Sequence, residues 1–405
     1  MNDHVIVVGL GFGDEGKGAT VDALCADGSV SAVVRFNGGA QAAHNVVVDG
    51  RHHTFSQFGS GTLAGVPTWL SRHVLVEPIA LATESRELEA LGVADPLSLM
   101  SIDAQALLTT PFHVAANRAR ENARGKDRHG SCGKGIGETV WYGLLEGATR
   151  GVVVEGQEVI GEPGSAPAVG DCLDPTTLRR KLDALARFYE PLIGDVISVD
   201  ELVMLYRSFA DAVRITTDDF GRLADTGRLV FEGAQGVLLD ETYGFHPHTT
   251  WSTTTPRNAK ALLGGRKARV IGVTRTYQTR HGAGPLPTED QAVLDRFPEA
   301  HNGTGEFQGA WRAGHLDANL LRYSVDCCGG IDGLAVTHLD ARGLRVATGE
   351  GLDDLPDPVA YLEELLDVDV LVTGAGPARA DYVVRDNPRH DRVDVGVGGR
   401  DRAPV

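Results

Sequence analysis

The chain has 405 residues, of which 42% are hydrophobic and 23% are charged. This balance excludes a wholly disordered chain, and the length allows two or three domains or one large α/β domain with insertions. Lys and Arg number 38 against 55 for Asp and Glu, and the net charge of −17 disfavours binding to nucleic acid or to an anionic membrane. An anionic ligand must therefore be held by local groups such as loop amides, helix N-termini and single basic residues.

The N-terminal residues lead directly into an apolar run at 5–8, without the basic region that opens a secretory signal. No apolar run in the sequence approaches the ~18–20 residues of a membrane span. The five cysteines are scattered and form no CxxC pair, which is typical of reduced thiols. These features predict a cytoplasmic protein that does not bind a membrane.

Short β-branched runs alternate with Gly-rich loops, which is the pattern of strand–loop–helix units. The first units are a buried parallel strand, a Gly-rich loop, a helix and a second strand, at residues 5–8, 9–18, 21–25 and 32–34. A helical pattern then begins at Asp174 and Pro175, which fit an N-cap and a first turn, and it continues to Val213. Strands return at 229–231, 270–273, 334–336 and 368–372.

This order predicts an α/β fold with a mostly parallel central sheet and a phosphate-binding loop after the first strand. We expect peripheral subdomains and a helical insertion at about 174–225, all within one large domain over residues 1–385. The polar residues 386–405 predict a C-terminal tail. Ligands of open α/β sheets bind at the carboxyl ends of the strands, where the Gly-rich loops follow.

The loop after the first strand fits the GxGxxG of dinucleotide-binding folds, with Gly11, Gly13 and Gly16. That motif needs an acidic residue at the end of the second strand to hold a ribose, but residues 35–37 read Arg-Phe-Asn. A dinucleotide-dependent oxidoreductase is therefore disfavoured.

The same loop fits the phosphate-binding pattern GxxxxGK, with Gly11, Gly16 and Lys17. Gly18 stands where that pattern has the Ser or Thr that ligates Mg²⁺. Asp14, inside the loop, is the obvious replacement, because Mg²⁺ prefers carboxylates together with substrate phosphates. The alternative interpretation of Asp14 is a solvated side chain in a tight Gly turn.

Residues 13–18, which read GDEGKG, resemble the signature of the adenylosuccinate synthetase family. Further blocks resemble that family in order and spacing, and they lie at residues 38–45, 113–115, 122–125, 130–137, 231–236, 238–240, 279–285 and 287–289. The resemblance extends from Val5 to about Arg379. Several ordered blocks are more specific than any single motif.

The resemblance implies a homodimeric ligase that uses GTP and Mg²⁺ to join L-aspartate to C6 of inosine monophosphate (IMP), giving adenylosuccinate in purine biosynthesis. The 6-oxo group is a poor leaving group, so the enzyme first phosphorylates it and the amine of aspartate then displaces phosphate. Phosphorylation needs a base for the N1 proton of the purine. The resemblance makes Asp14 this base and a metal ligand, makes His44 an acid or hydrogen-bond donor toward the GTP phosphates, and makes Gln235 the third catalytic residue.

The resemblance also implies the residues that bind each ligand. Contacts to GTP and its phosphates are expected from Gly13, Glu15, Gly16, Lys17, Gly18, Ala43, Asn45, Arg312, His338, Asp340 and Gly376. Contacts to the purine nucleotide and aspartate are expected from Gln41, Cys132, Lys134, Thr250, Arg280 and Arg312. Ala43 is implied as a second metal ligand beside Asp14, and Asp340 can accept the two N–H groups on the Watson–Crick edge of guanine.

The chain departs from the family pattern around the substrate. Gln41 and Ala43 replace Asn and Gly of the second signature, and Cys132 replaces a Thr that binds the substrate phosphate. In the loop that holds aspartate in the family, at 305–317, Arg312 is the clear basic match.

The phosphate of the substrate also loses a partner. The family's basic segment after Gly137, which supplies an Arg across the dimer interface, is missing here. We expect Lys134 to compensate within the same chain, and Lys126 and Arg128 to reach the site of a neighbouring subunit.

These departures leave the acceptor open. The second hypothesis is the same ligase chemistry on another 6-oxopurine nucleotide, such as dGMP or a modified purine, with GTP or ATP as the phosphate donor. A more remote hypothesis is a nucleotide-binding switch protein, which would bind GTP without aspartate-dependent release of phosphate.

Overall fold

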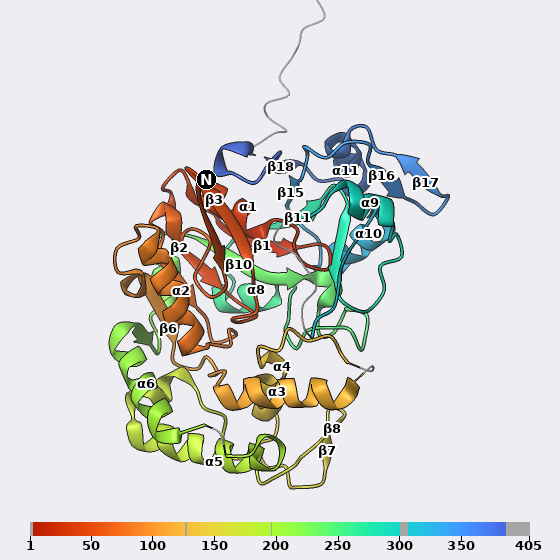
Figure 1. The fold of residues 1–405 in the computed structure, drawn as a ribbon. Coiled ribbons are helices and arrows are strands. Elements are labelled where there is room, and N and C mark those ends of the chain that lie inside the picture. Colours follow the sequence, from red (N-terminus) through yellow and green to blue (C-terminus); the bar gives the residue numbers. More distant parts are fainter. Residues whose placement is uncertain (1–2, 126–127, 196, 300–306, 386–405) are drawn as a thin grey trace, which may run out of the picture.

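The computed structural model describes residues 3–125, 128–195, 197–299 and 307–385, so the predicted tail at 386–405 lies outside the described residues. Ten strands of this part of the chain form one sheet (Figure 1), in the order β19 (Tyr382–Val384), β18 (Val370–Gly374), β15 (Gly333–Thr337), β11 (Ala268–Arg275), β1 (His4–Gly9), β10 (Arg228–Gly236), β2 (Val30–Arg35), β5 (Thr68–Leu70), β6 (Met100–Asp103) and β9 (Arg214–Thr216). Each neighbouring pair is parallel except β18 and β19. The predicted α/β class with a mostly parallel sheet is confirmed.

Helices and small sheets surround this sheet. The helices are α1 (Lys17–Cys25), α2 (Pro78–Ala90), α3 (Pro111–Arg124), α4 (Ile136–Gly143), α5 (Pro175–Ile193), α6 (Val199–Ala212), α7 (Phe220–Thr226), α8 (Arg257–Leu263), α9 (Gln291–Arg296), α10 (Ala318–Cys327) and α11 (Pro358–Leu366). Three small sheets are two-stranded and pair β3 (His44–Val48) with β4 (Arg51–Phe55), β7 (Val153–Val154) with β8 (Gln157–Glu158), and β12 (Gln278–His281) with β13 (Trp311–Gly314). A further sheet has three strands in the order β14 (Leu316–Asp317), β16 (Arg345–Ala347) and β17 (Leu352–Asp354).

The central strand β1 is buried on both faces. Successive strand residues point to opposite faces. Val5 therefore packs with Val21 of α1 in one cluster, whereas Ile6 packs with Leu263 of α8 and Leu321 of α10 in another. This arrangement explains why the strand is apolar at every position from 5 to 8, as the sequence predicts for a parallel strand covered on both sides.

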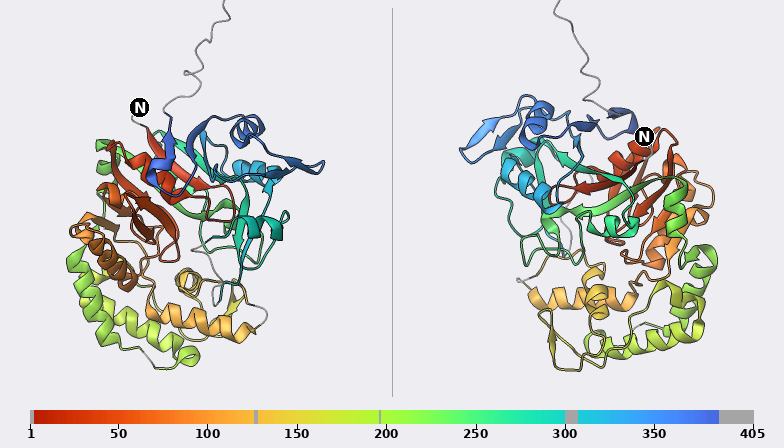
Figure 2. Two further views of the ribbon diagram at one scale, coloured as in Figure 1. Left: turned by 45° about the horizontal axis from the view of Figure 1, so that its top comes forward. Right: turned by 180° about the vertical axis from the view of Figure 1, so that it is seen from behind.

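The helices α3 to α6 form a separate layer at one end of the molecule, which both views of Figure 2 show. They share a hydrophobic cluster that includes Phe112, Leu182 and Tyr206. Asp174 caps α5 by accepting from Thr176 N at 3.0 Å, as predicted. The region 174–225 is not entirely helical, however, because β9 lies within it and pairs with β6 as the edge of the main sheet.

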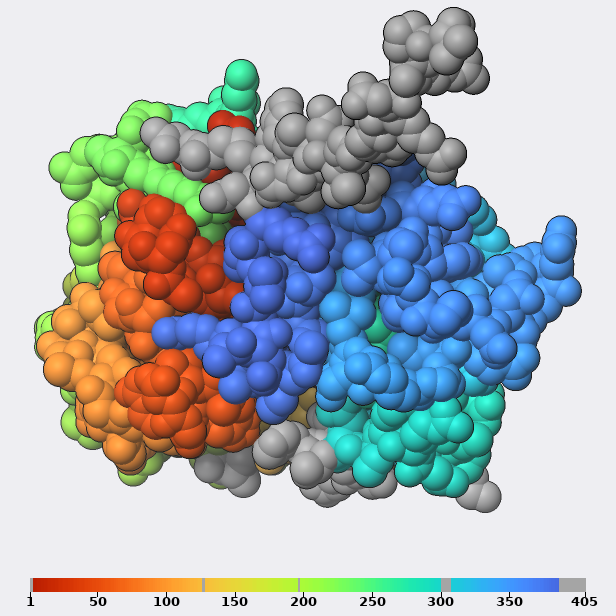
Figure 3. All heavy atoms as spheres, turned by 90° about the horizontal axis from the view of Figure 1, so that it is seen from above, coloured from red at the N-terminus to blue at the C-terminus, as the bar shows by residue number. Residues whose placement is uncertain are grey.

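The C-terminal end of the described chain packs against the N-terminal part, as Figure 3 shows by the dark blue and red segments. Arg379 donates from Nε and Nη2 to the two carboxylate oxygens of Asp22 on α1, at 2.7 and 2.5 Å. This contact holds the loop after β18 beside the first Gly-rich loop. None of the described helices combines the length and the hydropathy that crossing a membrane requires.

Candidate active site

The Gly-rich loop lies at the carboxyl end of β1, and α1 begins directly after it at Lys17. Gly13 and Gly16 adopt φ of 98° and 91°, a region that favours glycine. Asp14 between them has φ of 60°. The chain therefore turns sharply enough to aim the first amides of α1 at the space above the sheet, as in anion-binding loops.

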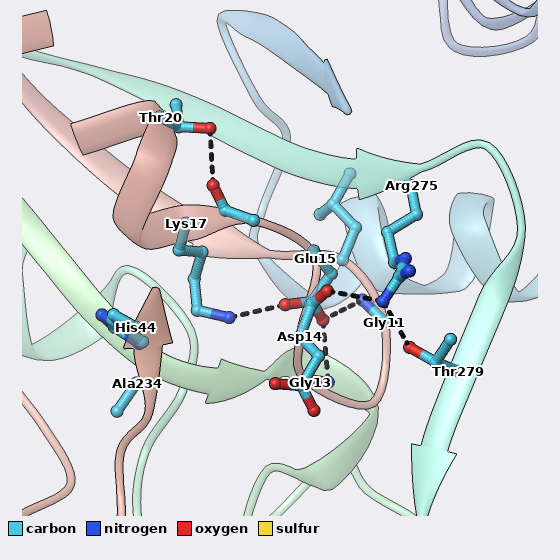
Figure 4. Close-up of polar contacts among 12 residues, drawn as sticks. Gly11, Gly13, Asp14, Glu15, Lys17, Thr20, His44, Ala234, Arg275 and Thr279 are labelled. Atoms are coloured by element: carbon cyan, nitrogen blue, oxygen red, sulfur yellow. Dashed lines mark hydrogen bonds and ion pairs between the residues drawn. The ribbon is translucent and has the colours of Figure 1, made fainter. Parts of the chain in front are cut away.

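Glu15 fills the inside of this loop (Figure 4). Its Oε1 accepts the amides of Gly11 and Gly13 at 2.9 Å each, and its Oε2 accepts Lys17 Nζ at 2.5 Å. Glu15 and Lys17 are both buried. To contact a phosphate as predicted, the ammonium of Lys17 must therefore bind the phosphate together with Glu15 or must leave Glu15 for it.

Asp14 lies beside two basic side chains. Its Oδ2 is 3.8 Å from Nε2 of His281, and its carbonyl accepts Arg275 Nη1 at 3.2 Å. Burial raises the pKa of the Asp14 carboxyl, and His281 and Lys17 oppose that rise. A carboxylate that is 29% exposed and has a raised pKa is suited to take a proton.

His44 opens β3 and its ring is held from behind by Glu232 of β10. The two side chains lie 2.5 Å apart, from Nδ1 to Oε1, and Ser60 donates its main-chain N–H to Oε2 at 2.9 Å. Burial would raise the pKa of Glu232, but His44, Arg35 and Ser60 hold it at about 2. Burial lowers the pKa of His44. The pair is therefore a neutral imidazole that donates from Nδ1 to an ionised carboxylate, and Nε2 is left for a ligand.

Packing explains the missing Ser or Thr at position 18. A Cβ on Gly18 would lie 2.7 Å from Cβ of His44 and 3.1 Å from Oγ of Ser60. Such contacts are too short for a side chain. The close approach of α1 to β3 therefore excludes the hydroxyl that ligates Mg²⁺ in other phosphate-binding loops.

One cavity of about 1110 Å³ unites most of the predicted site. The predicted residues that line it are Gly13, Asp14, Gly16, Lys17, Gly18, Gln41, Ala43, His44, Asn45, Cys132, Gln235, Thr250, Arg280, His338, Asp340 and Gly376. Glu15, Lys134 and Arg312 are not among its lining residues. Lys126 lies outside the described residues, and Arg128 stacks on Phe307 with its guanidinium 5.4 Å from the ring centre.

Two amide side chains of the cavity wall have buried atoms without a partner in the described part of the chain. Both amide atoms of Gln41 and Oε1 of Gln235 are buried without a hydrogen bond to any described residue. Buried polar groups in native proteins are normally bonded. These amides are therefore suited to the polar edge of a bound base.

Three residues of the cavity hold a left-handed backbone that is uncommon outside glycine. They are Asp14, Gln235 and His338, with φ of 60°, 64° and 57°. Such positions tend to gather at functional sites, where the surrounding structure holds them. Each of the three ends a strand of the central sheet or follows one, so strain and site coincide at the carboxyl edge.

Arg312, which we expect to contact aspartate, and Arg280, which we expect to contact the nucleotide, both bind groups of the protein in this structure. Arg312 forms an ion pair with Glu289 and donates from Nη1 to the carbonyls of Gly282 and Gly284 at 2.9 and 2.8 Å. Arg280 lines the cavity, but Nε, Nη1 and Nη2 donate to the carbonyls of Ala283, Pro285 and His248. Both guanidinium groups therefore stabilise loops.

Lys134 is likewise not placed as the sequence predicts. It is exposed, and it lies outside the lining of the cavity, although Cys132 two residues earlier is part of it. Spacing in the sequence alone could not reveal that Lys134 lies outside the lining of the cavity.

The described residues fit Mg²⁺ as a shared ligand with a nucleotide. No group of three or more His, Cys, Asp or Glu side chains in the described part of the chain could hold a metal by itself. Asp14 nevertheless offers a partly exposed carboxylate in the cavity, and Ala43 lines the same space. Mg²⁺ usually takes one or two carboxylates and completes its shell with substrate phosphates and water.

Sequence reasoning missed Glu232, Arg275 and His281. Glu232 lies in a block that resembles the family, but its role depends on His44, which is far away in the chain. Arg275 and His281 stand at the end of β11 and in β12, beside Asp14. Their position after a predicted strand of the sheet was the available signal.

Comparison with known proteins gives a consistent result. A family model described as adenylosuccinate synthetase matches residues 6–349. An adenylosuccinate synthetase of Marinomonas sp. is 34% identical over 359 residues, covering 84% of this chain and 77% of that protein. The Bordetella pertussis adenylosuccinate synthetase is 32% identical over 426 residues, covering 100% of this chain and 90% of that protein.

Solved structures share the fold. The fully ligated adenylosuccinate synthetase of Plasmodium falciparum has a TM-score of 0.77 at 20% identity, covering 95% of this chain and all of that one. A succinoaminodeoxyadenylate synthetase of cyanophage S-2L, bound to dGMP and dATP, has a TM-score of 0.65 at 18% identity, covering 96% and 97%.

Proposed function

Because the chain belongs to the adenylosuccinate synthetase family and is a ligase, we propose that it uses GTP and Mg²⁺ to join L-aspartate to C6 of IMP. The observation that carries this proposal is one cavity lined by residues 13, 14 and 16–18 of the loop, by His44, and by the amides of Gln41 and Gln235. The phosphate-binding loop, the Asp14 carboxylate and the two amides that are suited to a base all line this cavity. We further propose that it acts in the cytoplasm as a homodimer.

The first step transfers the γ-phosphoryl group to the purine. Asp14 takes the N1 proton, the 6-oxygen forms a bond to the γ-phosphorus, and GDP leaves. Mg²⁺ bound to Asp14 and the triphosphate would supply positive charge at the transferred group. His44, oriented by Glu232, presents Nε2 toward the phosphates, and their negative charge favours its protonated, donating form.

The second step forms the C–N bond. The amine of aspartate attacks C6 of the 6-phosphoryl purine, and inorganic phosphate leaves with the electron pair of the C6–O bond. We assign Gln235 to hold the base, and this assignment is supported by its buried Oε1, which lacks a partner among the described residues.

A second candidate function is the same reaction on another 6-oxopurine nucleotide, such as dGMP, with GTP or ATP as the donor. It is favoured by Gln41, whose longer amide replaces the family's Asn and is buried without a described partner. Cys132 also lines the cavity in place of a hydroxyl. Asp340 in the cavity supports guanine as the donor base, because a carboxylate accepts the two N–H groups of guanine.

The test is the release of phosphate by the purified protein with L-aspartate, varying the purine monophosphate and the triphosphate. Rapid release with IMP and GTP supports the first candidate, and preference for dGMP or a modified purine supports the second. Binding of GTP without aspartate-dependent release would contradict both and favour a switch protein.

A further inference from the structure

The cavity carries basic side chains that the proposed mechanism does not use. Arg124, His129 and His248 are among its lining residues, as are Cys132 and Thr250, which the family resemblance implies as contacts of the substrate phosphate. Arg124 ends α3, and His129 follows it in the turn before α4. His248 comes from the loop after β10, so two distant segments bring these groups together.

The loop that carries His248 is held rigidly. Its amide donates to Phe245 O at 3.1 Å, and its carbonyl accepts Arg280 Nη2 at 3.0 Å. Thr250 N donates to Leu239 O at 2.8 Å. Nδ1 of His248 is buried without a hydrogen bond to any residue that the structure describes. A buried ring nitrogen in a fixed loop is costly unless a ligand completes it.

The segment that carries His129 is held by Glu121 of α3. This carboxylate accepts Arg124 Nη1 at 2.8 Å and the amide of Gly130 at 3.3 Å. The loop of His248 reaches the start of α4, because a Cβ on Gly137 would lie 3.0 Å from Cδ1 of Trp251, three residues after His248. Burial and the charges of Arg124 and His248 lower the pKa of His129, whereas Glu121 raises it. Because Glu121 already balances Arg124, a dianion bound here needs additional positive groups.

We propose that His129 and His248 hold the 5′-phosphate of the acceptor nucleotide within a single subunit. The N-terminal end of α4 assists them, because Ile136 and Gly137 line the same cavity and helix N-termini attract anions. This inference rests on the proposed function and replaces the predicted role of Lys134. It also removes the need for a basic residue from a neighbouring subunit.

The experiment compares the full-length protein with the variants His129→Phe and His248→Phe, which keep a ring but remove its nitrogens. Isothermal calorimetry measures the affinities for IMP, inosine and GTP. We expect each variant to weaken IMP binding about 10–150-fold, the value of a hydrogen bond to a charged group, and to leave inosine and GTP binding unchanged. Sedimentation identifies the protein concentrations at which monomer or dimer predominates. The IMP affinity measured by calorimetry should be the same at both.

Two control variants accompany them. Lys134→Ala removes the exposed amine that the sequence favoured, and His73→Phe removes a half-buried histidine outside the cavity. Both should bind IMP as the parent protein does. A large loss in Lys134→Ala would overturn the proposal.

Other outcomes separate the inference from the function beneath it. Equal losses of IMP and inosine affinity in the histidine variants would indicate a packing role, and unchanged IMP affinity would place the phosphate elsewhere; either result overturns the inference alone. Failure of the parent protein to bind any purine monophosphate would contradict the proposed function as well.

Discussion

The carboxylate of Glu232 lies 2.5 Å from Nδ1 of His44, across 188 positions of sequence. Both side chains are buried, and Ser60 donates to the same carboxylate. The contact fixes which ring nitrogen of His44 carries the proton and where Nε2 points. Glu232 is therefore a positioning residue for the group expected to meet the triphosphate.

Replacing Glu232 with Gln should lower kcat about 10–100-fold, the usual effect of removing the partner that orients a histidine. The KM for aspartate should change little, because Glu232 acts through His44. Glu84→Gln is a matched control, since this buried carboxylate accepts amides of residues 56–58 outside the cavity. Steady-state kinetics and thermal unfolding of both variants separate the effects. An unchanged kcat in Glu232→Gln would contradict the orienting role.

Asp14→Asn should abolish measurable turnover while the fold remains intact. Loss of a general base costs about 10²–10⁴-fold, and loss of a carboxylate ligand for Mg²⁺ adds to it. Aspartate-dependent phosphate release measures the loss, and circular dichroism checks the fold. Asp27→Asn is the control, because this exposed carboxylate accepts the amide of Ser29 and lies outside the lining of the cavity. Near-normal turnover in Asp14→Asn would show that the proposed mechanism is wrong.

Gly18→Ser would restore the hydroxyl of other phosphate-binding loops, yet we expect it to harm the protein. The new Cβ would meet His44 at 2.7 Å, and overpacking of this kind costs about 1–3 kcal/mol. Urea unfolding should show that loss of stability, together with reduced activity. Gly349→Ser should have no such effect, because nothing lies within 4 Å of a Cβ there. A stable, active Gly18→Ser variant with tighter Mg²⁺ dependence would refute the steric explanation.

Local sequence features predicted six of the ten strands of the central sheet, together with the phosphate-binding loop. β1 and residues 229–231 of β10 read as strands because buried parallel strands carry apolar runs, and Asp174 identified the start of α5. The strands β5, β6, β9 and β19 were not predicted, because runs of three or four residues carry little periodicity.

The sequence predicted site residues that lie together in one motif. It could not predict which protein groups, distant in the sequence, would bind a candidate side chain. The loop residues 13, 14 and 16–18 line the cavity, whereas Glu15 is turned toward the amides inside the loop. Arg312 carries the residue type suited to a carboxylate, but Glu289 and two carbonyls already bind it. Only the folded chain reveals such competition.

Arg280→Lys should destabilise the fold and weaken nucleotide binding together. The planar guanidinium donates to three carbonyls and lies 4.4 Å from the centre of the Phe12 ring, and an ammonium cannot reproduce this fork. We expect the free energy of unfolding to fall by at least ~2 kcal/mol. Arg342→Lys is the control, because this exposed arginine also donates to carbonyls, and its loss should stay within ~0.5 kcal/mol. Equal stability of the two variants would show that the hydrogen bonds of Arg280 to the three carbonyls do not stabilise the fold.

His113 should make the protein less stable in acid. The side chain is fully buried, and burial lowers its pKa to about 3, from 6.5 in an unfolded chain. Below about pH 6, His113 binds a proton in the unfolded state but stays neutral in the folded state. The stability contributed by neutral His113 is therefore present above pH 6.5 and is lost as the pH falls toward 3. The free energy of unfolding should decline by about 1.4 kcal/mol per pH unit from this group.

His113→Gln should remove that contribution while keeping a side chain that can accept the amide of Thr110 at the start of α3. Urea unfolding of both proteins between pH 7 and pH 4 measures the difference in slope. Parallel curves would show that other groups cause the acid sensitivity, and that His113 is protonated in the folded state.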